Sequence, residues 1–107
     1  MRKIEAQMND AISRGANWHS GNTRVEFDPT NETSVVYLHD NMIAIVGRDA
    51  IKLFDGGWQS LTTKSRLNAI LATFGLAGER VFAKNFDWFV RMTDGSAIPF
   101  RSSMRLA

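Results

Sequence analysis

The amino-acid sequence predicts an α+β fold in which two helices pack on an antiparallel sheet. Two stretches show the spacing of apolar residues typical of amphipathic helices, and the segments between and after them alternate with a period of two. Short turns separate the expected strands, and the strand-helix-strand alternation of a parallel sheet is missing. The 107 residues fit a single domain, 1–107, with the order α-β-β-β-β-α-β-β-β.

The first half of the chain predicts a helix, a loop and four strands. Apolar residues at spacings of three and four place the first helix at residues 3–14, and Gly15 is suited to a left-handed helix end. Residues 16–22 are polar and are expected to form a loop. Four strands joined by short turns, an antiparallel meander, are then expected at 23–28, 33–39, 42–46 and 50–54.

The second helix has the clearest pattern in the chain. Its expected apolar face consists of Leu67, Ile70, Leu71 and Phe74. Thr62 or Thr63 is the expected N-cap, and Gly75 the expected left-handed residue at the other end.

Three further strands are expected after this helix. They lie at residues 80–84, 88–92 and 97–100, and Pro99 makes the last of them an edge strand because proline cannot donate to a ladder. The tail, residues 101–107, is expected to be frayed.

Composition restricts the possible classes of function. The chain has no cysteine, which excludes disulfides and thiolate chemistry and agrees with a reducing compartment. It has neither an apolar run long enough for a membrane span nor a signal-peptide core, so we expect a soluble protein that is not exported. The net charge is +2, but residues 56–107 hold seven Lys/Arg against three Asp/Glu, a balance of +4.

No catalytic, metal or cofactor site is predicted. Glycine-rich phosphate-binding motifs are absent, and the only two histidines, His19 and His39, lack the spacing of metal ligands. A nucleophile and base at His19 and Ser20 would need a geometry that their adjacency does not supply. We therefore expect a protein that is not an enzyme and needs no transition metal.

A candidate nucleic-acid site lies at the start of the second helix. Lysine and arginine at a helix N-terminus oppose the helix dipole, so they do little for the helix itself. The free N–H groups at this end favour an anion such as phosphate, so the position suits contact with an anionic partner. Two further clusters combine aromatic side chains with basic or amide ones, a composition suited to base stacking. The structural alternatives to a binding role are helix capping and an ordinary polar helix face for the residues of the second helix, and core packing for the aromatic residues. The candidate residues are Lys64, Ser65, Arg66, Asn68, Lys84, Arg91 and Trp18.

Four segments also carry a family resemblance: WHSGNTRV, VVYLHDNMIAIV, GWQSLTTKSRLNAIL and FAKNFDWFVR. In this order they resemble a group of short proteins encoded by tailed bacteriophages, over about residues 5–92. The run TTKSRLN, residues 62–68, is the most specific part. The resemblance implies a phage protein made in the cytoplasm of the infected bacterium, and it assigns no role to any residue.

Together these observations predict a small phage protein that binds nucleic acid through a basic face at the start of the second helix. The alternative is an effector that binds and inhibits a host enzyme or defence component. Binding to nucleic acid should weaken steeply with salt, because it depends on counterion release, whereas an apolar protein interface should be less sensitive. The sequence predicts no oligomeric state.

Overall fold

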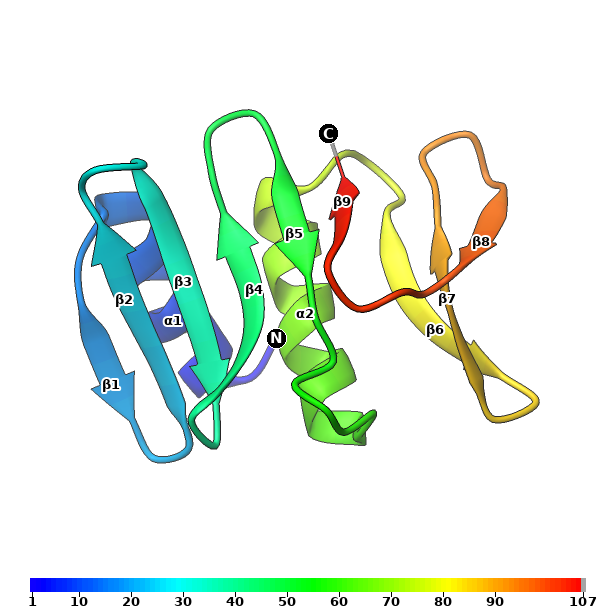
Figure 1. Ribbon diagram of the computed structural model, residues 1–107, viewed down its shortest axis with the longest axis horizontal. Coiled ribbons are helices and arrows are strands. Elements are labelled where there is room, and N and C mark those ends of the chain that lie inside the picture. The colour runs from blue at the N-terminus through cyan, green and yellow to red at the C-terminus, as the bar shows by residue number, and fades with distance from the viewer. Residues whose placement is uncertain (107) are drawn as a thin grey trace.

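The computed structural model describes residues 1–106 and confirms the α+β class (Figure 1). Its strands form two antiparallel sheets rather than one: six in the order β1-β2-β3-β4-β5-β9, and three in the order β6-β7-β8. In chain order the elements are α1 (Lys3–Arg14), β1 (Trp18–Ser20), β2 (Thr23–Asp28), β3 (Thr33–Leu38), β4 (Asn41–Val46), β5 (Ile51–Leu53), α2 (Leu61–Phe74), β6 (Arg80–Lys84), β7 (Asp87–Arg91), β8 (Ala97–Pro99) and β9 (Met104–Leu106).

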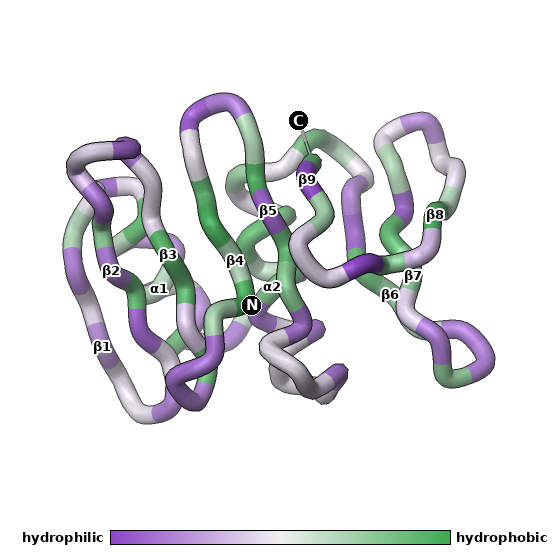
Figure 2. Tube along the Cα trace, viewed as in Figure 1, coloured by the Kyte–Doolittle hydropathy of each residue, from purple (hydrophilic) through white to green (hydrophobic). Residues whose placement is uncertain are grey.

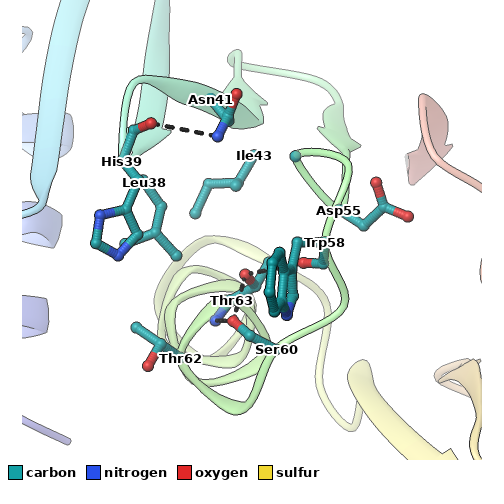
Figure 3. A pocket seen from close by; sticks show the side chains of 10 residues that line it. Leu38, His39, Asn41, Ile43, Asp55, Trp58, Ser60, Thr62 and Thr63 are labelled. Carbon is teal, nitrogen blue, oxygen red and sulfur yellow. Dashed lines mark hydrogen bonds between the residues drawn. The ribbon is translucent and has the colours of Figure 1, made fainter.

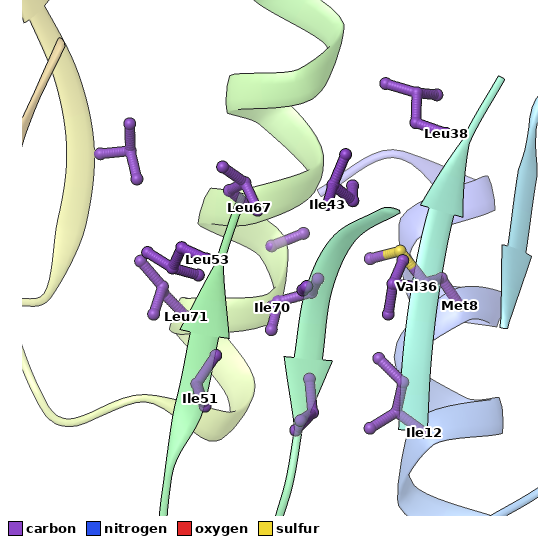
Figure 4. Close-up of a cluster of buried hydrophobic side chains, with 14 of the residues drawn as sticks. Met8, Ile12, Val36, Leu38, Ile43, Ile51, Leu53, Leu67, Ile70 and Leu71 are labelled. Atoms are coloured by element: carbon purple, nitrogen blue, oxygen red, sulfur yellow. The ribbon is translucent and has the colours of Figure 1, made fainter. Parts of the chain in front are cut away.

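Both helices cover the same face of the six-stranded sheet, and the main core lies between these two layers (Figures 1 and 4). The strands β3 and β4 contain hydrophobic stretches, whereas hydrophilic residues gather in the turns (Figure 2). Leu67, Ile70 and Leu71 of α2 are buried as predicted, and Phe74 is half-buried at the margin of the core. Asn9 of α1 joins the helices, since its amide donates to the carbonyl of Ala69 at 2.9 Å.

The helix ends match the predictions in part. Gly15 has φ 60° and ψ 40°, which confirms the left-handed end of α1. The N-cap of α2 is Ser60, whose hydroxyl accepts from the Thr63 N–H at 3.0 Å, so the prediction of Thr62 or Thr63 was wrong by less than one turn.

The predicted left-handed conformation of Gly75 was also wrong, because this residue is extended, with φ −81° and ψ −179°. Glycine is needed there for space. A Cβ would lie 2.7 Å from the carbonyl oxygen of Leu71 and 2.8 Å from the Glu79 carboxylate.

The first strand was missed at the sequence level. Residues 16–22 were expected to be a loop, but Trp18–Ser20 pairs with β2 around a two-residue connection, Gly21 and Asn22. Gly21 has φ 55°, a conformation that a glycine adopts without strain. The strand is only three residues long and mostly polar, so periodicity could not reveal it.

The expectation of a frayed tail was also wrong for residues 101–106. Met104–Leu106 forms β9 and pairs with β5, with Leu106 opposite Ile51 and buried. This pairing joins segments far apart in the sequence, and a local pattern cannot show it. Residue 107, the end of the predicted tail, lies outside the described residues.

The three-stranded sheet is a meander with a two-residue turn, Asn85 and Phe86, between β6 and β7. Its inner face carries buried side chains, including Trp88, which meets Phe100 edge to face with ring centroids 5.3 Å apart. Pro99 lies in β8 at the edge of this sheet, as predicted.

We expect Leu71→Ala to lower the free energy of unfolding by about 2–5 kcal/mol, because the side chain is only 1% exposed and its removal leaves a cavity. Chemical denaturation followed by circular dichroism measures this change. Leu61→Ala is the matched control, since Leu61 lies on the same helix and is 77% exposed. Equal losses in the two variants would contradict the core described above.

Candidate nucleic-acid interface

Arg66 does not reach solvent at the start of α2. Its side chain is 3% exposed, and it forms a buried ion pair with Glu5 of α1 at 2.9 Å. Its Nε donates to the Thr23 hydroxyl at 3.1 Å, and another guanidinium nitrogen donates to Asn22 at 3.4 Å. Arg66 therefore joins α2 to α1 and to the first hairpin, and in this arrangement it is unavailable to a partner.

Ser65 belongs to the same buried cluster. Its hydroxyl donates to the Glu5 carboxylate at 2.6 Å, and the backbone N–H of Arg2 donates to the other carboxylate oxygen at 3.2 Å. Burial raises the pKa of Glu5, but the hydrogen bonds from Ser65, Arg66 and Arg2, together with the Arg66 charge, outweigh it and leave this pKa below its ordinary value. Glu5 is thus held as a carboxylate.

Asn68 attaches the small sheet to α2. Its amide oxygen accepts from the Val81 N–H at 2.7 Å, and its amide nitrogen donates to the Val81 carbonyl at 2.9 Å. One side chain thereby satisfies both backbone groups of Val81 on the edge of β6 that faces α2. Asn68 has a structural contact, although it remains partly exposed.

Lys64 is the remaining candidate on α2, and it lines a surface groove of about 580 Å³. Arg2 and Arg80 line the same groove, which follows the side of α2 toward β6. Among residues 1–106, Glu5 contributes the only carboxylate to the lining, and this carboxylate is paired with Arg66. The groove therefore presents three cations.

The outer face of the three-stranded sheet combines aromatic rings with cations. Phe82 and Phe89 are cross-strand partners whose rings stack with centroids 5.7 Å apart and an interplanar angle of 24°. The guanidinium of Arg91 lies over the Phe82 ring, 5.4 Å from its centroid. Both phenylalanines are half-buried, and neither packs against the hydrophobic core. We call this face, with its side chains Arg80, Phe82, Lys84, Asp87, Phe89 and Arg91, the platform.

Arg80 connects the platform with the groove, because side chains two residues apart on a strand share a face and Arg80 also lines the groove. Within residues 1–106, none of Arg2, Lys64, Arg80, Lys84 and Arg91 forms an ion pair. Asp87, opposite Lys84 in the register, is the one acidic residue on these two strands. Groove and platform together form a basic surface that includes the stacked pair of Phe82 and Phe89.

Trp18 lies away from this surface. It is half-buried in β1, at the far edge of the six-stranded sheet, and packs against the core (Figure 1). Arg24, in the neighbouring strand, pairs with Glu26 and Asp40 and covers the Tyr37 ring at 4.1 Å from its centroid. The structure thus joins Lys64, Lys84 and Arg91 through the groove and the platform, and it leaves Trp18 apart.

A cavity of about 430 Å³ lies between the β3–β4 turn and the start of α2 (Figure 3). Trp58 and His39 flank it, and Ile43 lies at its back. The hydroxyls of Ser60 and Thr63 bond to each other at 2.9 Å, and the start of α2 is capped by this pair. In the described part of the chain, no group of three or more His, Cys, Asp or Glu residues could hold a metal ion.

Sequence reasoning singled out Lys84 and Arg91 but did not assign Arg80, Phe82 and Phe89 to the site. The signal was present: both expected strands carry apolar residues on both faces, and one face alternates phenylalanine with cations. A strand covered on one side only normally keeps its solvent face polar. Half-buried aromatic rings among cations on such a face therefore mark it as a candidate binding surface.

The fold and this surface define a small α+β protein. Over residues 1–106, neither helix is long and apolar enough to cross a membrane. The chain belongs to the family described as Kyanoviridae Gp96 protein, which matches residues 1–107 and confirms the resemblance to phage proteins. It is thus a cyanophage protein. No curated protein and no solved structure matches the chain.

We expect Arg66→Met to lower the free energy of unfolding by about 3–5 kcal/mol, because Glu5 would remain buried without its cation. The double variant Glu5→Gln/Arg66→Met should recover part of this loss. Arg14→Met is the control, since Arg14 forms an exposed pair with Asp10 and should change stability little. Similar losses for Arg14→Met and Arg66→Met in urea denaturation would contradict the buried pair.

The lowered pKa of Glu5 also predicts a pH dependence. The ionised carboxylate contributes stability that is fully present above its ordinary pKa of 4.5 and is lost as the pH falls through the lower pKa of the folded state. Glu5→Gln should therefore lose less stability than the wild type over this acid range. Parallel curves of unfolding free energy against pH for the two proteins would argue against a lowered pKa.

Proposed function

We propose that this protein binds single-stranded nucleic acid across the platform and the groove, in the cytoplasm of the infected host. The observation that supports this proposal is the stacked pair of Phe82 and Phe89 on a sheet face outside the core. The cations around this pair have no ion-pair partner within residues 1–106. Aromatic side chains on an open sheet offer a stacking surface to unpaired bases, and the surrounding arginine and lysine side chains bind phosphates.

The geometry favours a single strand over a duplex. Bases of a duplex are paired and stacked on one another, and their faces are not available to a protein ring. Direct readout of a duplex requires a helix or a two-stranded ribbon that enters a groove. The platform instead presents two rings on the surface of a sheet, and the groove continues from it through Arg80 toward Lys64.

The charges favour an anionic partner. The buried pair removes Glu5 and Arg66 from the balance, which leaves Arg2, Lys64 and Arg80 in the groove. A nucleic acid that neutralises these cations and those of the platform releases counterions, so its affinity should depend strongly on salt. A host protein that docks on the two rings is the alternative partner.

We expect the protein to bind an oligothymidylate of about 10 nucleotides at low salt, a length within the range that small single-strand-binding folds occupy. Fluorescence anisotropy measures the affinity. Phe82→Leu and Phe89→Leu should each weaken binding by about 1–3 kcal/mol, the usual contribution of one stacked base. A wild type without affinity for single-stranded DNA or RNA would overturn the proposal and favour the host-protein alternative.

Charge variants test the path of the phosphates. Arg80→Gln, Arg91→Gln and Lys64→Ala should each weaken binding and reduce the slope of log K against log salt by about 0.7 for every phosphate that the variant no longer neutralises. Arg48→Gln is the matched control, because Arg48 is exposed in the turn between β4 and β5, outside the interface. If Arg80→Gln and Arg91→Gln weakened binding but Lys64→Ala did not, the nucleic acid would lie on the platform and not in the groove.

A further inference from the structure

The turn between β6 and β7 has an unusual residue at its tip. Asn85 has φ 53° and Phe86 has φ 69°, which is the pattern of a two-residue hairpin turn with both central residues left-handed. Asparagine tolerates this conformation, and the second position is normally glycine. A large side chain with a Cβ is disfavoured there, because the Cβ approaches the following carbonyl oxygen.

No packing of the Phe86 side chain in the described structure offsets the cost of this backbone conformation. Its side chain is fully exposed and belongs to no part of the hydrophobic core. Six residues other than glycine have positive φ within residues 1–106, and Phe86 is the only apolar one among them. Backbone strain and full exposure of an aromatic ring both disfavour this residue, and strained positions of this kind are concentrated at binding sites.

The turn extends the hairpin that carries the platform (Figure 1). Phe86 follows Phe82 by four residues, at most about 13 Å along an extended strand. Lys84 lies between these two positions and supplies a cation for the phosphate that would link neighbouring nucleotides. The end of the platform therefore holds a ring close in the chain to a cation, with Asp87 opposite this cation.

We propose that Phe86 is a third stacking side chain, which takes the base next to those on Phe82 and Phe89 and so sets the length of strand that the protein covers. This inference rests on the proposed function, because it assumes that the platform binds a single strand. A planar ring at a hairpin tip is accessible on both faces, so it can insert between two successive bases.

Phe86→Gly separates this role from any role in folding, because its two effects have opposite signs. Removing the ring should weaken binding of the oligothymidylate by about 5- to 150-fold, the equivalent of one stacked base. The same change relieves the backbone and should raise the melting temperature by a few degrees. Anisotropy and thermal unfolding, measured on the same samples, report the two effects.

Three further variants separate the ring from the strain. Asn85→Gly relaxes the turn but keeps the ring, so it should preserve the affinity. Phe86→Trp keeps an aromatic ring and should bind at least as tightly as the wild type, whereas Phe86→Leu keeps apolar bulk and should bind as weakly as Phe86→Gly. Binding of a dinucleotide, measured by chemical-shift titration, should be insensitive to Phe86→Gly, because Phe82 and Phe89 already accommodate two bases.

The outcomes distinguish this inference from the proposed function. If the wild type binds the oligothymidylate and Phe86→Gly binds equally well, Phe86 makes no contact and only this inference is overturned. If Phe86→Leu binds as tightly as the wild type, apolar contact rather than stacking is responsible, and the inference is again wrong. If the wild type does not bind at all, the proposed function fails together with this inference.

Discussion

The buried ion pair between Glu5 and Arg66 is the constraint on which the arrangement of the layers depends. Two charges without water are tolerated only when their remaining hydrogen-bonding groups are satisfied, and Thr23, Ser65 and Asn22 supply those partners. These groups come from α1, α2 and the first hairpin, so a shift of any one element would leave a charge unsatisfied. Apolar side chains alone would permit such shifts, since hydrophobic contact has no direction.

The same constraint positions the candidate interface. Arg66 fixes the position of α2 and therefore that of Asn68, two residues further along the helix. The side-chain amide of Asn68 holds the edge of β6 through both backbone groups of Val81. Buried Val81 and Val90 then orient the small sheet so that Phe82 and Phe89 remain on its outer side. The candidate interface is therefore built on strands and a helix rather than on loops, a condition for holding aromatic rings in a defined geometry.

The sequence predicted what short-range pattern controls and missed what long-range pairing controls. The two helices, the central strands and the buried face around Ile70 follow from periodicity. The pairing of β9 with β5 depends on residues about fifty positions apart, and the division into two sheets depends on where Asn68 holds β6. The burial of Arg66 could not be predicted for a similar reason: helical spacing places it near the polar face, and only tertiary structure shows that Glu5 lies opposite it. For the candidate site, composition proposed Lys84 and Arg91. The two rings could be proposed only by considering which residues of each strand share a face.

A small sheet with an open apolar face would ordinarily be an aggregation hazard, because its edges can recruit strands from other chains. Both edges of the three-stranded sheet are partly protected against such recruitment. Asn68 occupies the backbone groups of Val81 on the β6 side. On the β8 side, Phe100 donates to Trp88 across the sheet, so the alternation of the ladder places the missing N–H of Pro99 on the outward edge. These two features make strand addition at either edge of this sheet less favourable, although the sheet carries aromatic rings on its outer face.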